Sequence, residues 1–306
     1  MLFRDEANTV TVGAPAKLNL FLEVLGRRTD GFHELETLMV TVGLHDTLRF
    51  VPNATGELRL TCIDARSRHR PGAASDPLPL SSGADNLVMR AALLLKETTG
   101  TNSGADIQLF TRIPLAAGLA GGSSDAAATL AGLNRLWKLG LSASDLQQLA
   151  AKLGSDIPFF LASEGTGAAV CRGRGELIEP VRLPHRMHFV VVRPRSGLST
   201  ADVFKHCRPG SSGKRVENLV CALQQGRLHT AASSFHNSLQ PAAEILNADV
   251  TQMKQAFERL PFIGHLMSGS GTSYYGLCGQ RDQAAKLAAR LKGARLGDVM
   301  TVQSRP

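Results

Sequence analysis

The chain has 306 residues, 43% of them hydrophobic and 20% charged, which is the composition of a folded protein rather than of a disordered or fibrous one. Its length favours two domains of medium size. Lysine and arginine number 34 against 26 acidic residues, and the resulting charge of +8 suits an anionic partner. Charge alone does not distinguish nucleic acid, a membrane surface and a phosphorylated metabolite.

No apolar run approaches the ~18 residues that a membrane-spanning helix needs. The N-terminal segment, residues 1–6, lacks the basic region and apolar run of a signal peptide. We therefore expect a cytoplasmic protein. The cysteines are odd in number, scattered, and never in a C-x-x-C pair, which predicts reduced thiols rather than a disulfide framework or a zinc site. They are Cys62, Cys171, Cys207, Cys221 and Cys278.

The first third of the chain predicts strands followed by a helix. Residues 8–50 alternate apolar and polar positions, the pattern of half-buried strands. Residues 64–84 are rich in Gly, Pro and Ser and predict a surface loop. Asp85 is predicted to cap a helix that stops at Gly100, and a strand is predicted over residues 106–111.

The rest of the chain mixes helices and strands. Weak periodicity over residues 165–187 predicts a domain boundary there, which gives domains 1–178 and 179–306. The mixed order, without regular βαβα alternation, favours an α+β fold. The predicted elements are helices after residue 122 and over 144–153, a strand over 188–193, a helix from Pro241 to Leu260, a glycine-rich strand and turn over 265–278, and a helix over 282–292.

The strongest local signal is the segment P-L-A-A-G-L-A-G-G-S-S-D-A-A-A, Pro114–Ala128. A loop of small residues that leads into a helix N-terminus places several backbone N–H donors around one anion and predicts a phosphate site. Ser123 and Ser124 add hydroxyls for phosphate or Mg²⁺. The segment is neither G-x-x-x-x-G-K-[ST] nor G-x-G-x-x-G, which argues against P-loop, protein-kinase and Rossmann sites. The alternative for such a loop alone is an ordinary capped turn.

This loop resembles the second motif of the GHMP kinases. P-A-K-L-N-L-F-L at Pro15–Leu22 is similar to the first motif of that superfamily, and M-S-G-S-G-T-S-Y-Y-G-L at Met267–Leu277 is similar to the third. The three motifs occur in the family's order and spread over nearly the whole chain. The resemblance implies a two-domain GHMP kinase fold: an N-terminal domain like ribosomal S5 domain 2, a ferredoxin-like C-terminal domain, and an active site between them that uses ATP and Mg²⁺.

Three further segments resemble the branch of the superfamily that acts on a cytidyl-diphosphate sugar alcohol: Arg28–Thr37, Asp85–Leu87 and Gly154–Phe160. This resemblance implies transfer of the ATP γ-phosphoryl group to the acceptor's 2-hydroxyl, in the non-mevalonate route to isoprenoids. The ATP-binding residues it implies are Asn86, Pro114, Ala117, Gly118, Leu119, Ala120, Gly121, Gly122, Ser123 and Ser124.

The same resemblance implies a catalytic pair. Asp156 follows Gly154 at a turn among apolar residues, where a carboxylate alone is more often a cap. Lys17 lies on the strand face opposite Leu18, where a lysine alone is more often a solvated edge residue. By resemblance, Asp156 is the base that takes the acceptor's proton, and Lys17 lies beside it, keeps it ionised and orients the hydroxyl.

Aromatic residues suit the pyrimidine ring of such an acceptor, because bases stack on aromatic planes. Core packing is the alternative for each of them alone. By resemblance, His33 recognises the cytosine edge between Phe32 and Phe204, although the Phe32 position is often tyrosine in that branch. The substrate-binding residues implied are Asn19, Phe32, His33, Thr200 and Phe204.

Two other functions compete with this interpretation. Another GHMP kinase, acting on mevalonate or homoserine, would need no cytosine pocket. An RNA-binding module would suit the S5-like fold and the net charge, but the basic residues are dispersed among acidic ones and no basic run is interleaved with aromatics. A catalytically inactive sensor is disfavoured because Lys17, the loop and Asp156 are all present. We expect a monomer or homodimer that binds small molecules, without nucleic acid or membrane.

Overall fold

Two long strands, β2 (Thr9–Arg27) and β3 (His33–Asn53), dominate the computed structural model, which describes residues 1–66, 81–210 and 212–305. Each strand contributes residues to two compact units of the chain. Unit 1 consists of Met1–Ala16, Leu44–Leu115 and Ala120–Glu164, and unit 2 of Lys17–Gly43, Ala116–Leu119 and Gly165–Pro306. Most of the predicted loop over residues 64–84 lies outside the described residues.

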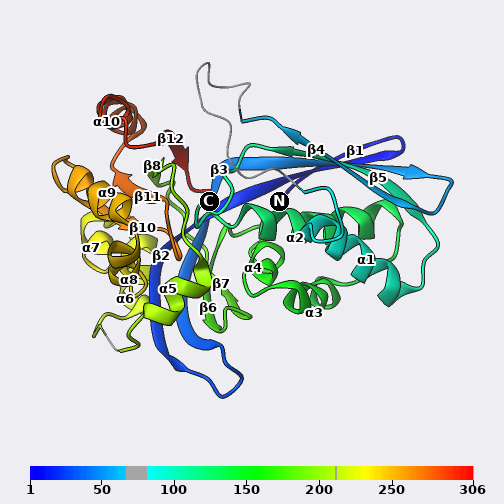
Figure 1. Ribbon diagram of the computed structural model, residues 1–306, viewed down its shortest axis with the longest axis horizontal. Helices are drawn as coiled ribbons and strands as arrows, with labels where there is room; N and C mark the ends of the chain where they lie inside the picture. The colour runs from blue at the N-terminus through cyan, green and yellow to red at the C-terminus, as the bar shows by residue number, and fades with distance from the viewer. Residues whose placement is uncertain (67–80, 211, 306) are drawn as a thin grey trace. The chain divides into compact units, whose positions relative to one another are not determined.

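Unit 1 is a sheet with helices on one side. β1 (Leu2–Glu6) pairs antiparallel with β2, β3 pairs antiparallel with β5 (Gly104–Thr111), and β5 pairs parallel with β4 (Leu58–Asp64). The helices are α1 (Leu87–Thr99), α2 (Gly121–Leu136), α3 (Ala143–Leu153) and α4 (Ile157–Ala162), and they lie together on one side of β4 and β5 (Figure 1). Alternate residues of β5 are buried, as expected for a strand with one face against helices.

Helix α1 begins one residue later than the sequence predicts. Asn86 is its N-cap, with Oδ1 accepting a hydrogen bond from Val88 N at 2.8 Å. Asp85 instead accepts a hydrogen bond from Ser81 Oγ at 2.6 Å, so its predicted capping role is wrong. The helix ends as predicted at Gly100, whose φ of 66° lies in the left-handed region that glycine adopts without strain.

Unit 2 contains a second sheet and most of the short helices. The second sheet is antiparallel, in the order β10 (Gly264–Met267), β11 (Tyr274–Cys278), β8 (His188–Arg193), β12 (Asp298–Gln303). The other strands of the unit are β6 (Ala168–Gly173), which pairs with β3 and β7 (Leu177–Pro180), and β9 (His236–Asn237), which runs parallel to β2. Its helices are α5 (Thr200–His206), α6 (Val216–Gln224), α7 (Leu228–Ser233), α8 (Gln240–Leu246), α9 (Ala248–Glu258) and α10 (Arg281–Gly293).

One apolar cluster holds the second sheet to its helices. Ala243 of α8, Met253 of α9 and Leu287 of α10 pack in one cluster with sheet residues such as Val190 and Tyr274. These side chains come from one stripe of each helix, the pattern that packs a helix onto a sheet. None of the helices in the described ranges is long and apolar enough to cross a membrane.

The mixture of helices and strands confirms the predicted α+β content, but individual elements differ from the prediction. The helix expected from Pro241 is two helices, because Asn247 takes an extended conformation (φ −149°, ψ 111°) and caps α9 by accepting from Asp249 N at 2.9 Å. The weakly periodic segment 165–187 contains β6 and β7, both absent from the prediction. The strand over 188–193 and the closing helix are confirmed.

The middle of β2 is buried on both faces. Every residue from Val12 to Val24 is buried, so the predicted half-buried alternation is wrong there. Three of these residues are polar: Lys17, Asn19 and Glu23, which are 3%, 2% and 4% exposed. Buried polar groups are costly unless they are hydrogen-bonded, so each needs partners from other segments.

Candidate active site

Lys17 is held inside unit 2 by Asn19. Its Nζ donates a 2.5 Å hydrogen bond to Asn19 Oδ1, and Asn19 Nδ2 donates in turn to Thr37 Oγ1 at 2.8 Å. Thr37 comes from the neighbouring strand β3 and donates its own hydroxyl proton to the Phe21 carbonyl at 2.5 Å. With Lys17 only 3% exposed, the alternative of a solvated edge lysine is wrong.

Segments of all three motifs meet in unit 2. Lys17 N donates to Leu119 O at 3.0 Å, which joins the first motif to the second. Ser268 Oγ donates to Gly118 O at 3.0 Å, which joins the third motif to the second. Ser268 Oγ also accepts from Asn19 N at 3.4 Å, which joins the third motif to the first. The motifs are far apart in sequence but share one hydrogen-bonded cluster.

Two glycines make this approach sterically feasible. Gly118 has a φ of +70°, and a Cβ there would lie 2.2 Å from Ser268 O. Gly269 has a φ of +58°, and a Cβ there would lie 3.1 Å from Lys17 Nζ and 3.3 Å from Asn19 Oδ1. Both the backbone conformation and the lack of space therefore require glycine.

In unit 1, the second motif continues into the N-terminus of α2. Ala120 takes a left-handed conformation (φ 56°), and no side chain caps the first turn of α2. Gly122 is exposed, and a Cβ there would meet Leu87 Cδ1 only at an ordinary 3.5 Å. Ser124 Oγ is buried without a hydrogen-bond partner among the described residues. An uncapped helix N-terminus with an unsatisfied buried hydroxyl fits an anionic ligand or its metal ion.

Two carboxyl groups lie buried beneath the first turn of α2. Burial raises the pKa of Asp125 well above its ordinary value, and the neighbouring Asp46 raises it further. Burial also raises the pKa of Asp46 to about 7, against hydrogen bonds from the backbone N–H groups of Arg112 and Ile113, the latter at 2.8 Å. Among the described residues, Asp125 Oδ1 has no hydrogen-bond partner. The charges of Arg112 and Arg66 also lower the pKa of Asp46, but burial outweighs them. Two close buried carboxyl groups favour a shared proton.

Asp156 precedes α4 in unit 1. It occupies the N-cap position, but its side chain makes no capping hydrogen bond to the helix. The residues after it, from Ile157 to Leu161, are buried, whereas Asp156 itself is partly exposed. The alternative role as a helix cap is thereby weakened. Asp156 and Lys17 belong to different units, and their predicted proximity stays a prediction.

The predicted acceptor residues all belong to unit 2. The rings of His33 and Phe204 lie 5.0 Å apart with an interplanar angle of 32°. Burial lowers the pKa of His33, and the nearby Arg27 charge lowers it further, which favours the neutral imidazole. Phe204 also packs against the apolar cluster of the unit, so part of its surface serves the core.

Phe32 and Thr200 have partners that the sequence did not indicate. Phe32 is 49% exposed, and the guanidinium carbon of Arg174 lies 4.7 Å from its ring centroid, a cation–π geometry. Thr200, at the start of α5, has its hydroxyl 2.9 Å from Ser270 Oγ in the third motif. The segment of α5 that carries Phe204 is thus linked to the same motif that contacts Lys17.

Asn86, one of the predicted ATP-binding residues, uses its side chain in hydrogen bonds within the protein. Its Oδ1 caps α1, and its Nδ2 donates to Ser81 O at 2.6 Å. Its predicted contact with ATP stays a prediction. Of the other predicted ATP residues, Pro114 and the stretch from Ala120 to Ser124 belong to unit 1, and Ala117, Gly118 and Leu119 to unit 2.

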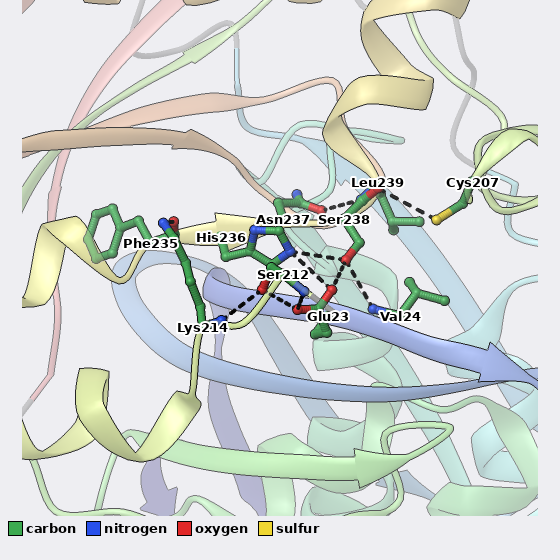
Figure 2. Close-up of polar contacts among 10 residues, drawn as sticks. All are labelled: Glu23, Val24, Cys207, Ser212, Lys214, Phe235, His236, Asn237, Ser238 and Leu239. Atoms are coloured by element: carbon green, nitrogen blue, oxygen red, sulfur yellow. Dashed lines mark hydrogen bonds and ion pairs between the residues drawn. The ribbon is translucent and has the colours of Figure 1, made fainter. Parts of the chain in front are cut away.

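Sequence reasoning missed a polar cluster around Glu23 (Figure 2). Glu23 Oε1 accepts from Ser238 Oγ at 2.6 Å and lies 3.2 Å from His236 Nε2. Glu23 Oε2 accepts from Ser212 N at 3.0 Å and from the Ser212 hydroxyl. Burial raises the pKa of Glu23, but the hydrogen bonds from Ser212 and Ser238 outweigh it, so the pKa lies below its ordinary value. An ionised Glu23 thereby ties β9 and the segment after residue 211 to β2.

Comparison with known proteins assigns the family. The chain matches the description "GHMP kinases N terminal domain" over residues 86–164 and "GHMP kinases C terminal" over residues 219–296. The chain therefore belongs to the GHMP kinase family and has its two-domain fold, as the three motifs predict. The boundary predicted after residue 178 lies between the two matched regions and stays a prediction.

Within this family, the chain is similar to kinases that carry a more specific name. The chain is 39% identical, over 92% of its length and 94% of the relative's, to the 4-diphosphocytidyl-2-C-methyl-D-erythritol kinase of Pelotomaculum thermopropionicum. A crystal structure of 4-(cytidine 5'-diphospho)-2C-methyl-D-erythritol kinase matches with a TM-score of 0.79 and 34% identity, covering 97% of this chain and 99% of that one. A homoserine kinase of Cytophaga hutchinsonii matches with a TM-score of 0.76 over 100% and 97% of the chains, but at 20% identity it shows the shared fold alone.

The buried carboxyl pair predicts a specific pH dependence of stability. Because the folded-state pKa values are raised, the pair's contribution is fully present below about pH 4, the unfolded pKa, and is lost as pH rises through about 7. Asp125→Asn removes one ionisable group at nearly constant shape. Relative to wild type, its free energy of unfolding should rise by at least about 1 kcal/mol between pH 4 and pH 8, since one pKa unit is worth about 1.4 kcal/mol.

Urea unfolding at a series of pH values measures this difference. Asp106→Asn, which changes a partly exposed carboxylate of β5, is the matched control for replacing an aspartate of unit 1 by asparagine. A difference between Asp125→Asn and wild type that stays constant from pH 4 to pH 8 would show that the pair holds no extra proton.

Proposed function

We propose that the chain transfers the γ-phosphoryl group of ATP to the 2-hydroxyl of 4-diphosphocytidyl-2-C-methyl-D-erythritol, a step of the non-mevalonate route to isoprenoid precursors. The observation that carries the proposal is the arrangement within unit 2. There the lysine of the first motif, held by the second and third motifs, shares one unit with the aromatic pair His33 and Phe204. The names and identities of the relatives support the choice of acceptor.

The chemistry requires little covalent help from the protein. Phosphoryl transfer needs two aligned substrates, compensation of phosphate charge, and an acceptor for the hydroxyl proton. The N-terminus of α2, with the N–H groups of its uncapped first turn, suits the ATP phosphates. Gly122 leaves room for a phosphate close to the backbone, since it carries no side chain and is exposed.

Mg²⁺ fits the same end of α2. A magnesium ion prefers oxygen ligands and usually binds through one or two protein groups together with substrate phosphates. The buried, unpartnered Ser124 Oγ supports such a role, and Ser123 is the neighbouring alternative. When bound, the ion neutralises phosphate charge.

Asp156 is proposed as the proton acceptor and Lys17 as its partner. The lack of a capping hydrogen bond at Asp156 supports this role over that of a helix cap. The ammonium group of Lys17, fixed by Asn19, can stabilise an ionised carboxylate and orient the acceptor hydroxyl. Asn19 is proposed to act mainly by holding Lys17, since both ends of its amide are already hydrogen-bonded.

The aromatic pair is proposed as the cytosine site. A neutral imidazole, as the lowered pKa of His33 favours, can both donate and accept a hydrogen bond at a base edge. Phe204 offers a ring face beside it, and the exposed Phe32 offers a second once Arg174 moves aside. Thr200, linked to the third motif through Ser270, is proposed as a further contact of the acceptor.

A direct assay tests the proposal. Purified protein with ATP and Mg²⁺ should phosphorylate 4-diphosphocytidyl-2-C-methyl-D-erythritol, with kcat/KM at least about 100-fold above that for mevalonate or homoserine, because a site built to bind a base discriminates strongly against acceptors that lack it. Phosphorus NMR of the product identifies the phosphorylated hydroxyl. A preference for homoserine or mevalonate would instead support the other GHMP kinase activity.

The cytosine site predicts a selective effect on the acceptor. His33→Ala and Phe204→Ala should each raise the acceptor KM by about 5- to 150-fold, since stacking is worth about 1–3 kcal/mol per base. The KM for ATP should hardly change. His229→Ala, at an exposed histidine of α7, is the control and should leave both constants near wild type. Equal increases for both substrates would contradict a cytosine site at these residues.

The proposed base predicts a loss of turnover without a loss of binding. Asp156→Asn keeps size and shape but removes the proton acceptor, so kcat should fall by about 10²- to 10⁴-fold. Binding of both substrates, measured by calorimetry, should persist. The double variant with Lys17→Met should lose much less than the product of the two single losses, as residues that act as one unit do.

The control is Asp145→Asn, which alters a capping carboxylate at the start of α3 and should keep wild-type kcat. If Asp156→Asn retained more than about a tenth of wild-type kcat, the loss would be smaller than even the low end of a general base's contribution. Asp156 would then be a turn residue and not the base. Multiplicative losses in the double variant would mean that the two residues act independently.

A further inference from the structure

Asn237, the last residue of β9, uses its whole amide on the backbone of unit 2. It is 4% exposed. Its Nδ2 donates to Met267 O and to Gly269 O, both at 2.8 Å, and its Oδ1 accepts from Leu239 N at 2.9 Å. A buried amide with both protons and its oxygen satisfied is held in one orientation, and so are the groups that it binds.

The two carbonyls that Asn237 binds flank Ser268, at the start of the third motif. Ser268 Oγ is the hydroxyl that bonds Gly118 O and Asn19 N, and Gly269 is the residue at which an added Cβ would lie 3.1 Å from Lys17 Nζ. By binding the carbonyls of Met267 and Gly269, the Asn237 amide fixes the turn around Ser268 relative to the lysine.

Asn237 is itself fixed to the strand that carries Lys17. β9 pairs with β2 through His236 opposite Phe21 and Asn237 opposite Leu22. The Glu23 cluster then holds the flanking residues His236 and Ser238, and Figure 2 shows Asn237 between them. The side chain of Asn237 therefore links β2, which carries Lys17, to the turn at the start of the third motif.

We propose that Asn237 is a positioning residue for phosphoryl transfer, acting through Ser268 and Gly269 on Lys17. The inference rests on the proposed function, because it assigns Lys17 to the reaction. The side-chain hydrogen bonds of Asn237 go to backbone atoms of Met267, Gly269 and Leu239, and not to the lysine or the phosphate loop. Its loss should therefore change the alignment of the reacting groups and not the binding of either substrate.

Gln240 provides a matched control. It is also a buried amide, 9% exposed, and its Oε1 accepts from Met267 N at 3.0 Å. Gln240 thus holds the same strand, β10, but it binds the backbone N–H of Met267 and makes no hydrogen bond to Gly269. A variant at Gln240 measures the cost of loosening β10 in general, whereas one at Asn237 also frees the turn.

The test compares Asn237→Ser with Gln240→Leu. Serine retains a hydroxyl that can accept from Leu239 N but is too short to reach both carbonyls. With 4-diphosphocytidyl-2-C-methyl-D-erythritol and ATP, kcat of Asn237→Ser should fall about 10- to 100-fold, the effect of a displacement on the order of 1 Å, while both KM values change less than about threefold. Gln240→Leu should lower the Tm similarly but keep kcat within about threefold of wild type.

A second variant guards against a folding defect in the first. Asn237→Asp can donate one hydrogen bond when its carboxyl is protonated and none when it is ionised. Its kcat relative to wild type should therefore rise as pH falls from 8 to 6, measured below the Tm of the variant. A purely structural role would move the folded fraction but not this ratio for the folded enzyme.

The outcomes separate the two hypotheses. If wild type and Gln240→Leu turn over and Asn237→Ser keeps wild-type kcat, the inference fails while the proposed function stands. An equal fall in kcat for both variants would also overturn it, because general anchoring of β10 would then explain the effect. If wild type does not phosphorylate this acceptor at all, the proposed function fails and the inference fails with it.

Discussion

Close backbone packing at Gly118 and Gly269 is the constraint on which the cluster around Lys17 depends. At each position the chain has a positive φ, and a single added carbon would meet a carbonyl oxygen or the catalytic candidate itself. Glycine-rich motifs are usually explained by the ligand that approaches them. Here two of the glycines serve contacts between the motifs themselves.

This packing places charge and amides in a poorly hydrated interior, and long-range hydrogen bonds offset the cost. The polar residues of β2 find their partners on β3, on β9 and after residue 211, and Tyr275 of β11 donates its hydroxyl to the Asn19 carbonyl at 2.9 Å. The strand is therefore held by specific polar contacts as well as by apolar burial. Such contacts favour one register, because a one-residue slip would leave every one of these groups without its partner.

The sequence was sufficient for the family and for several of the longer elements, but α5, α6 and α7 were not predicted. Periodicity located α3 and α10 because each has a regular apolar stripe, and β8 was found as a short continuous apolar run. It failed where tertiary contacts decide: β2 alternates in sequence but is covered on both faces, and Asn247 divides a continuous apolar stripe into two helices. The motifs pointed to Lys17 as a catalytic candidate and to residues 114–124 as a candidate phosphate loop, and both roles stay predictions. They could not identify Asn237, because its partners lie some 30 residues away in sequence and no local pattern marks it.

The path of the chain between the two units affects the order in which they can fold. The chain passes from one unit to the other at 16/17, 43/44, 115/116, 119/120 and 164/165. Unit 1 is contained within the first 164 residues. Unit 2 includes two earlier segments, Lys17–Gly43 and Ala116–Leu119, and both are synthesised before the second sheet of that unit. No single cut of the polypeptide can release unit 2 intact. During synthesis, residues 17–43 must therefore await partners that emerge from the ribosome more than a hundred residues later, which makes the completion of this unit a late event in the folding of the whole chain.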